Sequence, residues 1–442
     1  MSIIVKKYPN DFQIVYEKSL SDLPLTTLYI FCDVGSVYEY DKVRGASHFI
    51  EHMCFKGTKK ISSAKIFREY SKIGAYFNAY TSKRYTCYTV KCQDEYVGHS
   101  LEILADMLMN STFNETEYRR EEKVVVEENN NNDNKPEIIL EDALDRMLYE
   151  GSSYESPVDS LDYHTSRALK YRDVVDFYHT FYHPSRMLLS VVSNMSFKQI
   201  EGMCKKTVFM RKIPQKIPPI MPVIHHGITL FREPQYLLIE KRGITNVHLS
   251  IGFRTCGIRS NDKYALILLS KIMGNGLSGR LMTLLRERKG LVYGASTSMD
   301  LFEHMGDITF TTVTKKENFI KKSGQGVLPL LMGLIKDAVK RGVTNEELEI
   351  AKGNYQGNTV IDLQDIVTQT RYNGEAVLIE GLGYTKPIVP YQHIYDAFIR
   401  KITAKDVHRV LQRYFTKENM CVCVLSEKLP PLEIIKKYSE IL

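Results

Sequence analysis

The sequence has few of the features that mark secreted, membrane-spanning or nucleic-acid-binding proteins. Its eight cysteines are scattered without a Cys-x-x-Cys pair, and the chain opens without a secretory signal or an Arg-rich transit peptide, so we expect reduced thiols. Its longest apolar runs, such as 264–273, fall well short of the roughly 20 residues of a membrane-spanning helix. It also has no concentrated basic run of the kind that binds nucleic acid. We therefore expect a cytoplasmic protein, with the mitochondrial matrix as the alternative, and neither a membrane span nor a nucleic-acid partner.

What remains is the composition of a globular protein with more than one domain. With 442 residues the chain is too long for one compact core, and 43% hydrophobic residues with a net charge of +7 are ordinary values. Four prolines in the stretch 211–223, RKIPQKIPPIMPV, exclude a helix or a central strand and predict a linker. We predict an N-terminal domain over 1–212, a Pro-rich linker over 213–235 and a C-terminal domain over 236–442.

The two predicted domains follow a similar order of elements. LPLTTLYIFCDVGSVYEYDK in the first and ITNVHLSIGFRTCGIRSNDK in the second each contain an apolar strand, a glycine turn and the pair Asp-Lys, and a helical pattern follows each. A helix–strand unit closes each half. The predicted fold class is therefore α+β, with two homologous domains in which helices cover a sheet.

The stretch GASHFIEHMCFKGT, residues 45–58, is the strongest candidate for a site of chemistry. His48 and His52 are four residues apart and lie about one turn apart on one helix face, with Glu51 beside the second histidine. Imidazole nitrogens at this spacing can bind one zinc ion, while the carboxylate can take a proton from bound water. The alternative is an ordinary helix with polar residues on one face. The order His-x-x-Glu-His, the inverse of His-Glu-x-x-His, favours the metal site.

The second predicted domain shows what an ordinary helix at this place contains. When the Asp-Lys pair at 41–42 is aligned with that at 262–263, apolar residues stand opposite the two histidines and the glutamate. These apolar residues are Leu269, Ile272 and Met273. The first domain thus has metal-competent side chains on the stripe that its counterpart uses for a core. Burial of such side chains without partners is costly, so a metal or a dense hydrogen-bond network is expected there.

A catalytic zinc site keeps three protein ligands and one open position, so a third ligand is needed. In YRREEKVVVEENNNN, Glu121 and Glu128 are seven residues apart and share one helix face. Such a helix could direct Glu128 to the metal and place Glu121 behind it, where it orients a ligand. The run alone is more typical of a solvated, charged helix.

The sequence resembles the pitrilysin family of zinc peptidases. The family pattern is His-x-x-Glu-His followed about 76 residues later by a glutamate, and Glu128 lies 76 residues after His52 (128 − 52). Three further stretches are similar to family segments: GAYFNAYTSKRYTCYTV, FYHTFYHPSRMLLSVV and GLSGRLMTLLRERKGLVYGAS. The resemblance covers nearly the whole chain. The length matches the branch of two-domain chains to which the catalytic subunit of the mitochondrial processing peptidase and its bacterial relatives belong.

This resemblance implies a zinc-dependent endopeptidase that cleaves peptides or unfolded segments inside a closed clam-shell chamber, of which one chain forms half. It implies one Zn²⁺ per chain, bound by His48, His52 and Glu128. Glu51 is then the general base that activates the zinc-bound water, and Glu121 lies behind the ligands. The second domain lacks zinc ligands in this comparison.

The resemblance also implies contacts with a peptide substrate. Asn78 and Ala79 match the strand to which family members add their substrate as a further β-strand. Arg286 and Tyr293 match an arginine and a tyrosine that reach the substrate carbonyl from the second domain, where they are suitable donors to an oxyanion. Without the resemblance, a surface arginine and a packed tyrosine would be the simpler interpretations.

A further match concerns specificity and partners. Glu137 and Glu141 are four residues apart on a predicted helix, near the places where the processing peptidase has two acidic residues that recognise an arginine. The alternative is a solvent-exposed helix end. The resemblance implies a homodimer or a heterodimer with a related chain. The alternative function is a catalytically silent scaffold or binding subunit of the same fold.

Overall fold

The computed structural model describes residues 3–158, 169–211, 231, 233–274, 276, 278–321, 323–440 and 442. Most of the predicted linker 213–235 lies outside these residues. The chain forms two compact units. Unit 1 comprises residues 1–131, 156–224 and 359–393, and unit 2 comprises residues 132–155, 225–358 and 394–442.

Unit 1 is built on a six-stranded sheet with the order β1-β2-β6-β3-β5-β4. Its strands are β1 (Ile4–Lys7), β2 (Gln13–Lys18), β3 (Leu25–Cys32), β4 (Tyr76–Thr81), β5 (Thr86–Gln93) and β6 (Met187–Ser193). β2 and β6 are parallel, and all other neighbours are antiparallel. The central strands β3 and β6 are almost wholly buried, whereas β4 stands at one end of the order and is only partly covered.

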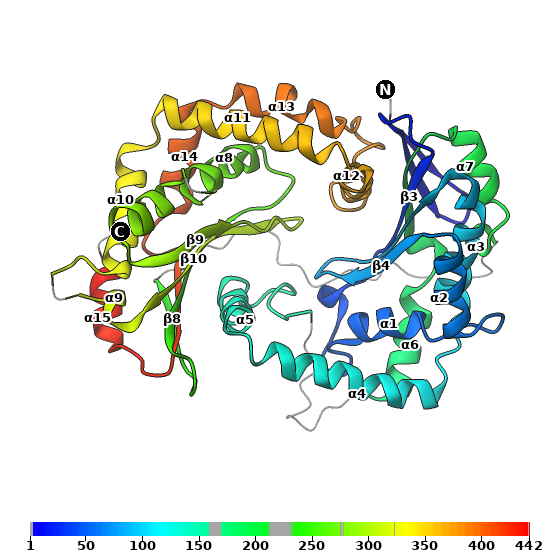
Figure 1. The fold of residues 1–442 in the computed structure, drawn as a ribbon, viewed down its shortest axis with the longest axis horizontal. Coiled ribbons are helices and arrows are strands. Elements are labelled where there is room, and N and C mark those ends of the chain that lie inside the picture. Colours follow the sequence, from blue (N-terminus) through cyan, green and yellow to red (C-terminus); the bar gives the residue numbers. More distant parts are fainter. Residues whose placement is uncertain are drawn as a thin grey trace. The chain divides into compact units, whose positions relative to one another are not determined.

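Helices cover both faces of this sheet (Figure 1). Successive side chains of a strand point to opposite faces, and on β5 the side chains of Tyr88 and Lys91 mark the two faces. The helices of unit 1 are α1 (Ala46–Cys54), α2 (Ser63–Lys72), α3 (Val97–Asn110), α4 (Glu115–Asn132, its last residue in unit 2), α6 (Tyr171–Phe181), α7 (Phe197–Cys204) and α12 (Ile366–Leu378). α1 and α3 pack on the Tyr88 face, and α12 packs on the Lys91 face.

α12 covers the sheet of unit 1 although it comes late in the sequence. Asn373 donates a hydrogen bond of 2.8 Å from its amide to the buried carboxylate of Glu17 on β2. One turn of α12 comes so close to β3 that a Cβ atom on Gly374 would stand 2.1 Å from the ring of Phe31. Glycine is therefore required for this approach, because any side chain would have to displace the aromatic ring.

Among its described residues, unit 2 repeats the same sheet without a counterpart of β1. Its strands are β7 (Gln235–Glu240), β8 (Asn246–Cys256), β9 (Val292–Ser298), β10 (Met305–Lys315) and β11 (Met420–Ser426). The order β7-β11-β8-β10-β9 matches β2-β6-β3-β5-β4. The pair β7 and β11 is parallel, like β2 and β6, and the other neighbours are antiparallel. The two units thus confirm the predicted α+β fold of two similar domains.

The helices of unit 2 also lie on both faces of its sheet. They are α5 (Pro136–Leu148), α8 (Asp262–Gly274), α9 (Lys316–Phe319), α10 (Val327–Arg341), α11 (Asn345–Asp362, ending in unit 1), α13 (Ile394–Ala397), α14 (Ala404–Tyr414), α15 (Leu432–Ser439) and the π-helical segment Met282–Arg288. α5 packs on β8 and β11, where a Cβ on Gly252 would stand 2.8 Å from the Leu148 side chain. None of the described helices is long and apolar enough to cross a membrane.

Packing does not follow the predicted halves of the chain. α5 belongs to the first half by sequence but packs on the sheet of unit 2, and α12 belongs to the second half but packs on the sheet of unit 1. The predicted domain boundaries at residues 212 and 236 separate the two sequence repeats. They remain a prediction.

Candidate metal centre

α1 carries the two histidines and the glutamate of the predicted motif, and its start is fixed by two local features. Gly45 precedes the helix with φ 81°, a left-handed conformation that favours glycine. The carboxylate of Glu39 accepts hydrogen bonds from the backbone N–H groups of Gly45 (2.6 Å) and Ser47 (2.8 Å). These are N–H groups for which the first turn of a helix has no internal acceptor. Burial raises the pKa of Glu39 to about 7, although these two bonds act to lower it.

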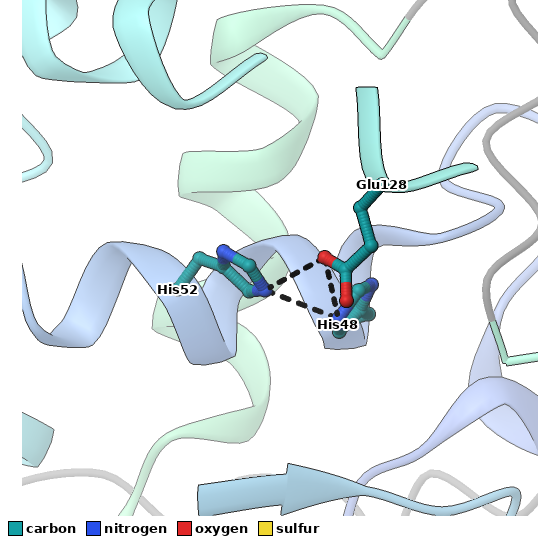
Figure 2. A group of neighbouring side chains, drawn as sticks. All are labelled: His48, His52 and Glu128. Atoms are coloured by element: carbon teal, nitrogen blue, oxygen red, sulfur yellow. Dashed lines mark hydrogen bonds and ion pairs between the residues drawn. The ribbon is translucent and has the colours of Figure 1, made fainter. Parts of the chain in front are cut away.

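Three side chains of unit 1 converge at this helix, and Figure 2 shows them: His48 and His52 on α1, and Glu128 reaching them from α4. The Nε2 atoms of the two histidines are 3.1 Å apart. Oε2 of Glu128 is 4.0 Å from Nε2 of His48 and 3.7 Å from Nε2 of His52. Among the residues that the structure describes, these three offer donor atoms close enough together to hold one metal ion. A solvated, charged helix therefore does not explain the position of Glu128, whose carboxylate lies beside both histidines.

The donor set fits zinc in kind and in spacing. Two nitrogens and one carboxylate oxygen form a common ligand set of catalytic zinc, and Zn–N and Zn–O bonds of tetrahedral sites place ligand atoms about 3.3 Å from one another. The separation of 3.1 Å lies close to that value, and those of 3.7 and 4.0 Å are longer. The carboxylate of Glu128 is 45% exposed, so the cluster is open to solvent on its side.

Glu121 lies directly behind the cluster, two helical turns before Glu128 on α4. Its Oε1 is 2.8 Å from Nδ1 of His52, and its Oε2 is paired with Nζ of Lys56. A carboxylate only accepts hydrogen bonds, so Nδ1 carries the proton and Nε2 presents its lone pair to the cluster. This is the arrangement by which an outer carboxylate orients a histidine ligand.

The electrostatics of the cluster favour a cation. Burial of the His52 imidazole acts to lower its pKa, but the hydrogen bond to Glu121 and the charges of three nearby carboxylates outweigh this effect and raise it. Burial acts to raise the pKa of Glu121, but its bonds from His52 and Lys56 outweigh that effect and lower it. A site that stabilises a positive imidazole is also one that attracts a metal ion.

Glu51 lies on the same helix as the two histidines, and its carboxylate is hydrogen-bonded to the sheet. Its side chain is buried, at 9% exposure, and Oε2 accepts a hydrogen bond of 2.6 Å from Oγ1 of Thr81, the last residue of β4. Sequence reasoning did not identify Thr81, Lys56 or Glu39 as parts of this site. Thr81 lies in the Asn-Ala-x-Thr-Ser stretch that resembles the family, which was the available signal for it.

Asn78 and Ala79 lie in the middle of β4, the strand at the end of the sheet. They point to opposite faces. The backbone carbonyl of Asn78 accepts a hydrogen bond of 3.2 Å from Thr89 on β5. The structure thus places them on a terminal strand, three and two residues before Thr81, and outside the metal-donor cluster.

Arg286 and Tyr293 come together in unit 2. The guanidinium of Arg286, in the π-helical segment, lies 5.2 Å from the ring centroid of Tyr293 on β9. Both line an open cavity of about 420 Å³, together with Gly274, Met282 and neighbouring residues of β9 and β10. Tyr293 is 88% exposed, so it is not the packed aromatic residue of the simpler interpretation.

Glu137 and Glu141 are exposed residues of the first two turns of α5. They belong to unit 2, whereas the metal-donor cluster belongs to unit 1. The i, i+4 spacing predicted for them is present, and nothing in their position within unit 2 tests their role.

The His-x-x-Glu-His helix, the glutamate on a second helix and the repeated α+β unit define the class of inverse-motif zinc metallopeptidases. Residues 16–160 match the family model described as Insulinase (Peptidase family M16), and residues 168–355 match the one described as Peptidase M16 inactive domain. The chain belongs to peptidase family M16, the insulinase or pitrilysin family, as the resemblance implied.

Relatives of known name agree with this assignment. An uncharacterised zinc protease of Bacillus subtilis, YmxG, is 29% identical over 427 residues, which are 96% of this chain and 98% of that protein. The crystal structure of a protease from Helicobacter pylori is similar in fold, with a TM-score of 0.85 at 21% identity over 96% of this chain and 100% of that one. A structure from Pseudomonas fluorescens, described as a peptidase M16 inactive domain, gives a TM-score of 0.81 at 16% identity over 97% and 98% of the two chains.

Proposed function

We propose that the protein is a zinc-dependent endopeptidase whose active centre lies on α1 of unit 1. The observation that carries this proposal is the convergence of His48, His52 and Glu128, with the buried carboxylate of Glu51 on the same helix. One Zn²⁺ per chain would be held by those three residues. The zinc proteases among its relatives support the metal and the hydrolase class.

Zinc bound at this place would act as a Lewis acid that polarises the scissile carbonyl and lowers the pKa of water. Glu51 accepts a proton from the attacking water and passes it to the leaving amine, as a carboxylate beside such a site can do. Glu121 holds His52 in its ligand tautomer. The substrate backbone pairs with β4 at Asn78 and Ala79, and recognition through backbone hydrogen bonds would give little sequence preference.

The second unit has a supporting role in this proposal. Arg286 and Tyr293 donate to the developing oxyanion, a role supported by their exposure and by their common cavity. Cleavage takes place in a closed chamber made from two such chains, as a homodimer or with a related chain in the manner of the processing peptidase. The eight cysteines are all buried free thiols, which supports a cytoplasmic location.

The test combines metal analysis with hydrolysis of an internally quenched peptide by the wild type and by Glu51→Gln. We expect about one zinc per chain in both proteins and cleavage by the wild type only, because Glu51 is a base and not a ligand. A wild type that binds zinc but cleaves no peptide, alone or with a related chain, would leave the scaffold function of the same fold in its place.

A further inference from the structure

We infer that Thr81 is a positioning residue, which holds the carboxylate of Glu51 in the orientation needed for proton transfer. This inference rests on the proposed function. Oγ1 of Thr81 donates a 2.6 Å hydrogen bond to Oε2 of Glu51, within the range of O–H···O⁻ bonds to an ionised acceptor. Both residues belong to unit 1, where α1 packs directly against β4.

A glutamate base needs such a partner. Its side chain has three rotatable torsions, the last of which is broad, so its two oxygens are not oriented by packing alone. A hydroxyl that donates to Oε2 fixes this last torsion. An ionised carboxylate can accept several hydrogen bonds, so this single bond leaves it able to act as a base. The bond does not fill a metal-ligand position, so its loss should affect proton transfer rather than metal binding.

Thr81 is itself held in place by the hairpin that it closes. It pairs with Thr86 in the β4–β5 register, and the four-residue loop between them is closed by hydrogen bonds of 2.8 Å from both the N–H and the Oγ of Ser82 to the carbonyl of Tyr85. The β-branched side chain of threonine also has a restricted χ1 angle. The donor is therefore fixed in both backbone and side chain.

Two parts of unit 1 anchor this hairpin loop from outside. A Cβ on Gly35 would stand 2.3 Å from the carbonyl oxygen of Ser82, so the loop rests against a backbone position that only glycine can supply. The hydroxyl of Tyr85 donates to the partly buried carboxylate of Glu375 on α12. The late helix α12 thus supports the strand end that orients the base, and the loop is part of a rigid scaffold for the site.

The experiment compares Thr81→Val, Thr81→Ser and Thr86→Val with the wild type. Valine keeps the shape of threonine but removes the donor, and serine keeps the donor. Thr86→Val is the matched control, because it removes the neighbouring hydroxyl of the same hairpin, whose 2.9 Å bond goes to the carbonyl of Val34 and not to Glu51. Zinc content, melting temperature, kcat and KM for one peptide are measured on all four proteins.

We expect Thr81→Val to lower kcat by about tenfold to hundredfold, the effect of losing one hydrogen bond to a charged group, with KM and zinc content unchanged. Thr81→Ser should restore most of this loss, and Thr86→Val should keep the wild-type kcat. Equal kcat in Thr81→Val and wild type, or an equal loss in Thr86→Val, would overturn the inference while leaving the proposed function intact. A wild type without peptidase activity would overturn the proposed function, and the role of Thr81 with it.

Discussion

The helix after the first long strand is buried in both units, but its chemistry differs. In unit 1, α1 buries His48 and Glu51. In unit 2, α8 buries Leu269 and Met273, which stand opposite His48 and His52 in the sequence alignment. The strand order around the two helices is the same. One position of the fold therefore serves as an apolar core or as a polar site, and only the polar version needs partners such as Glu121 and Glu128, and in the proposed function a zinc ion, to offset the cost of burial.

The difference between α1 and α8 is tested most severely by placing the apolar residues of α8 at the histidine positions of α1. His48→Leu together with His52→Met should abolish stoichiometric zinc binding and all peptidase activity, because two of three ligands are lost. The protein should stay folded, since apolar side chains fill the same stripe in α8. Metal analysis, peptide hydrolysis and circular dichroism check this result. Zinc at wild-type affinity in the double variant would contradict the assignment of the ligands.

Unit 2 has no catalytic stripe on α8, but it is expected to contribute to catalysis in another way. Arg286→Ala and Tyr293→Phe should each lower kcat by about 10²-fold, the usual effect of removing one oxyanion donor. The zinc content should not change, because neither residue belongs to the donor cluster. Steady-state kinetics on zinc-replete protein checks the prediction. Full turnover in both variants would refute the role of these two residues as oxyanion donors.

The polar network behind the ligands can be weakened without touching the ligands. Glu121→Gln should lower zinc affinity by about tenfold to hundredfold, because an amide is a poorer acceptor for Nδ1 of His52 than a carboxylate. Competition with a zinc chelator measures this affinity. Glu127→Gln, on the exposed side of α4, is the matched control and should bind zinc like the wild type. Equal affinity in both variants would remove Glu121 from the site.

The contacts of α12 with the sheet of unit 1 and of α5 with the sheet of unit 2 can be compared by their effect on the free energy of unfolding. Gly374→Ala should destabilise unit 1 by about 1–3 kcal/mol, because its Cβ meets the ring of Phe31, which cannot easily move. Gly252→Ala in unit 2 should cost less, since its Cβ meets the flexible end of Leu148. Urea unfolding of both variants gives the difference. A larger loss for Gly252→Ala would contradict this view of the two contacts.

The smallest expected effect concerns specificity. If the exposed carboxylates of Glu137 and Glu141 recognise a substrate guanidinium, the wild type should cleave peptides with arginine near the scissile bond better than alanine versions. Glu137→Gln with Glu141→Gln should remove that preference and leave cleavage of the alanine peptide unchanged. The ratio of kcat/KM for the two peptides measures it. Equal cleavage of both by the wild type would leave the pair as surface charge.

The repeated α+β fold was predicted from local periodicity and the repeated order of elements, and the pairing of His48 with His52 from their spacing on one helix face. Glu128 was assigned through the resemblance to the family, because the charged run around it indicates only a solvated helix. The seven-residue step from Glu121 to Glu128 places both on one helix face, and the structure brings them to His52. The exchange of α5 and α12 was not predicted, because an amphipathic pattern shows that a face is buried but not against which sheet. The bond from Thr81 to Glu51 was missed for a similar reason, since it depends on how β4 and α1 pack.

The most direct test of the account is a zinc-edge anomalous difference map from a crystal of the zinc-loaded protein. We expect one strong peak per chain, bounded by Nε2 of His48, Nε2 of His52 and the carboxylate of Glu128, and no peak at α8 of unit 2. A peak bound by other residues, or no peak at the α1 cluster in protein that contains stoichiometric zinc, would contradict it.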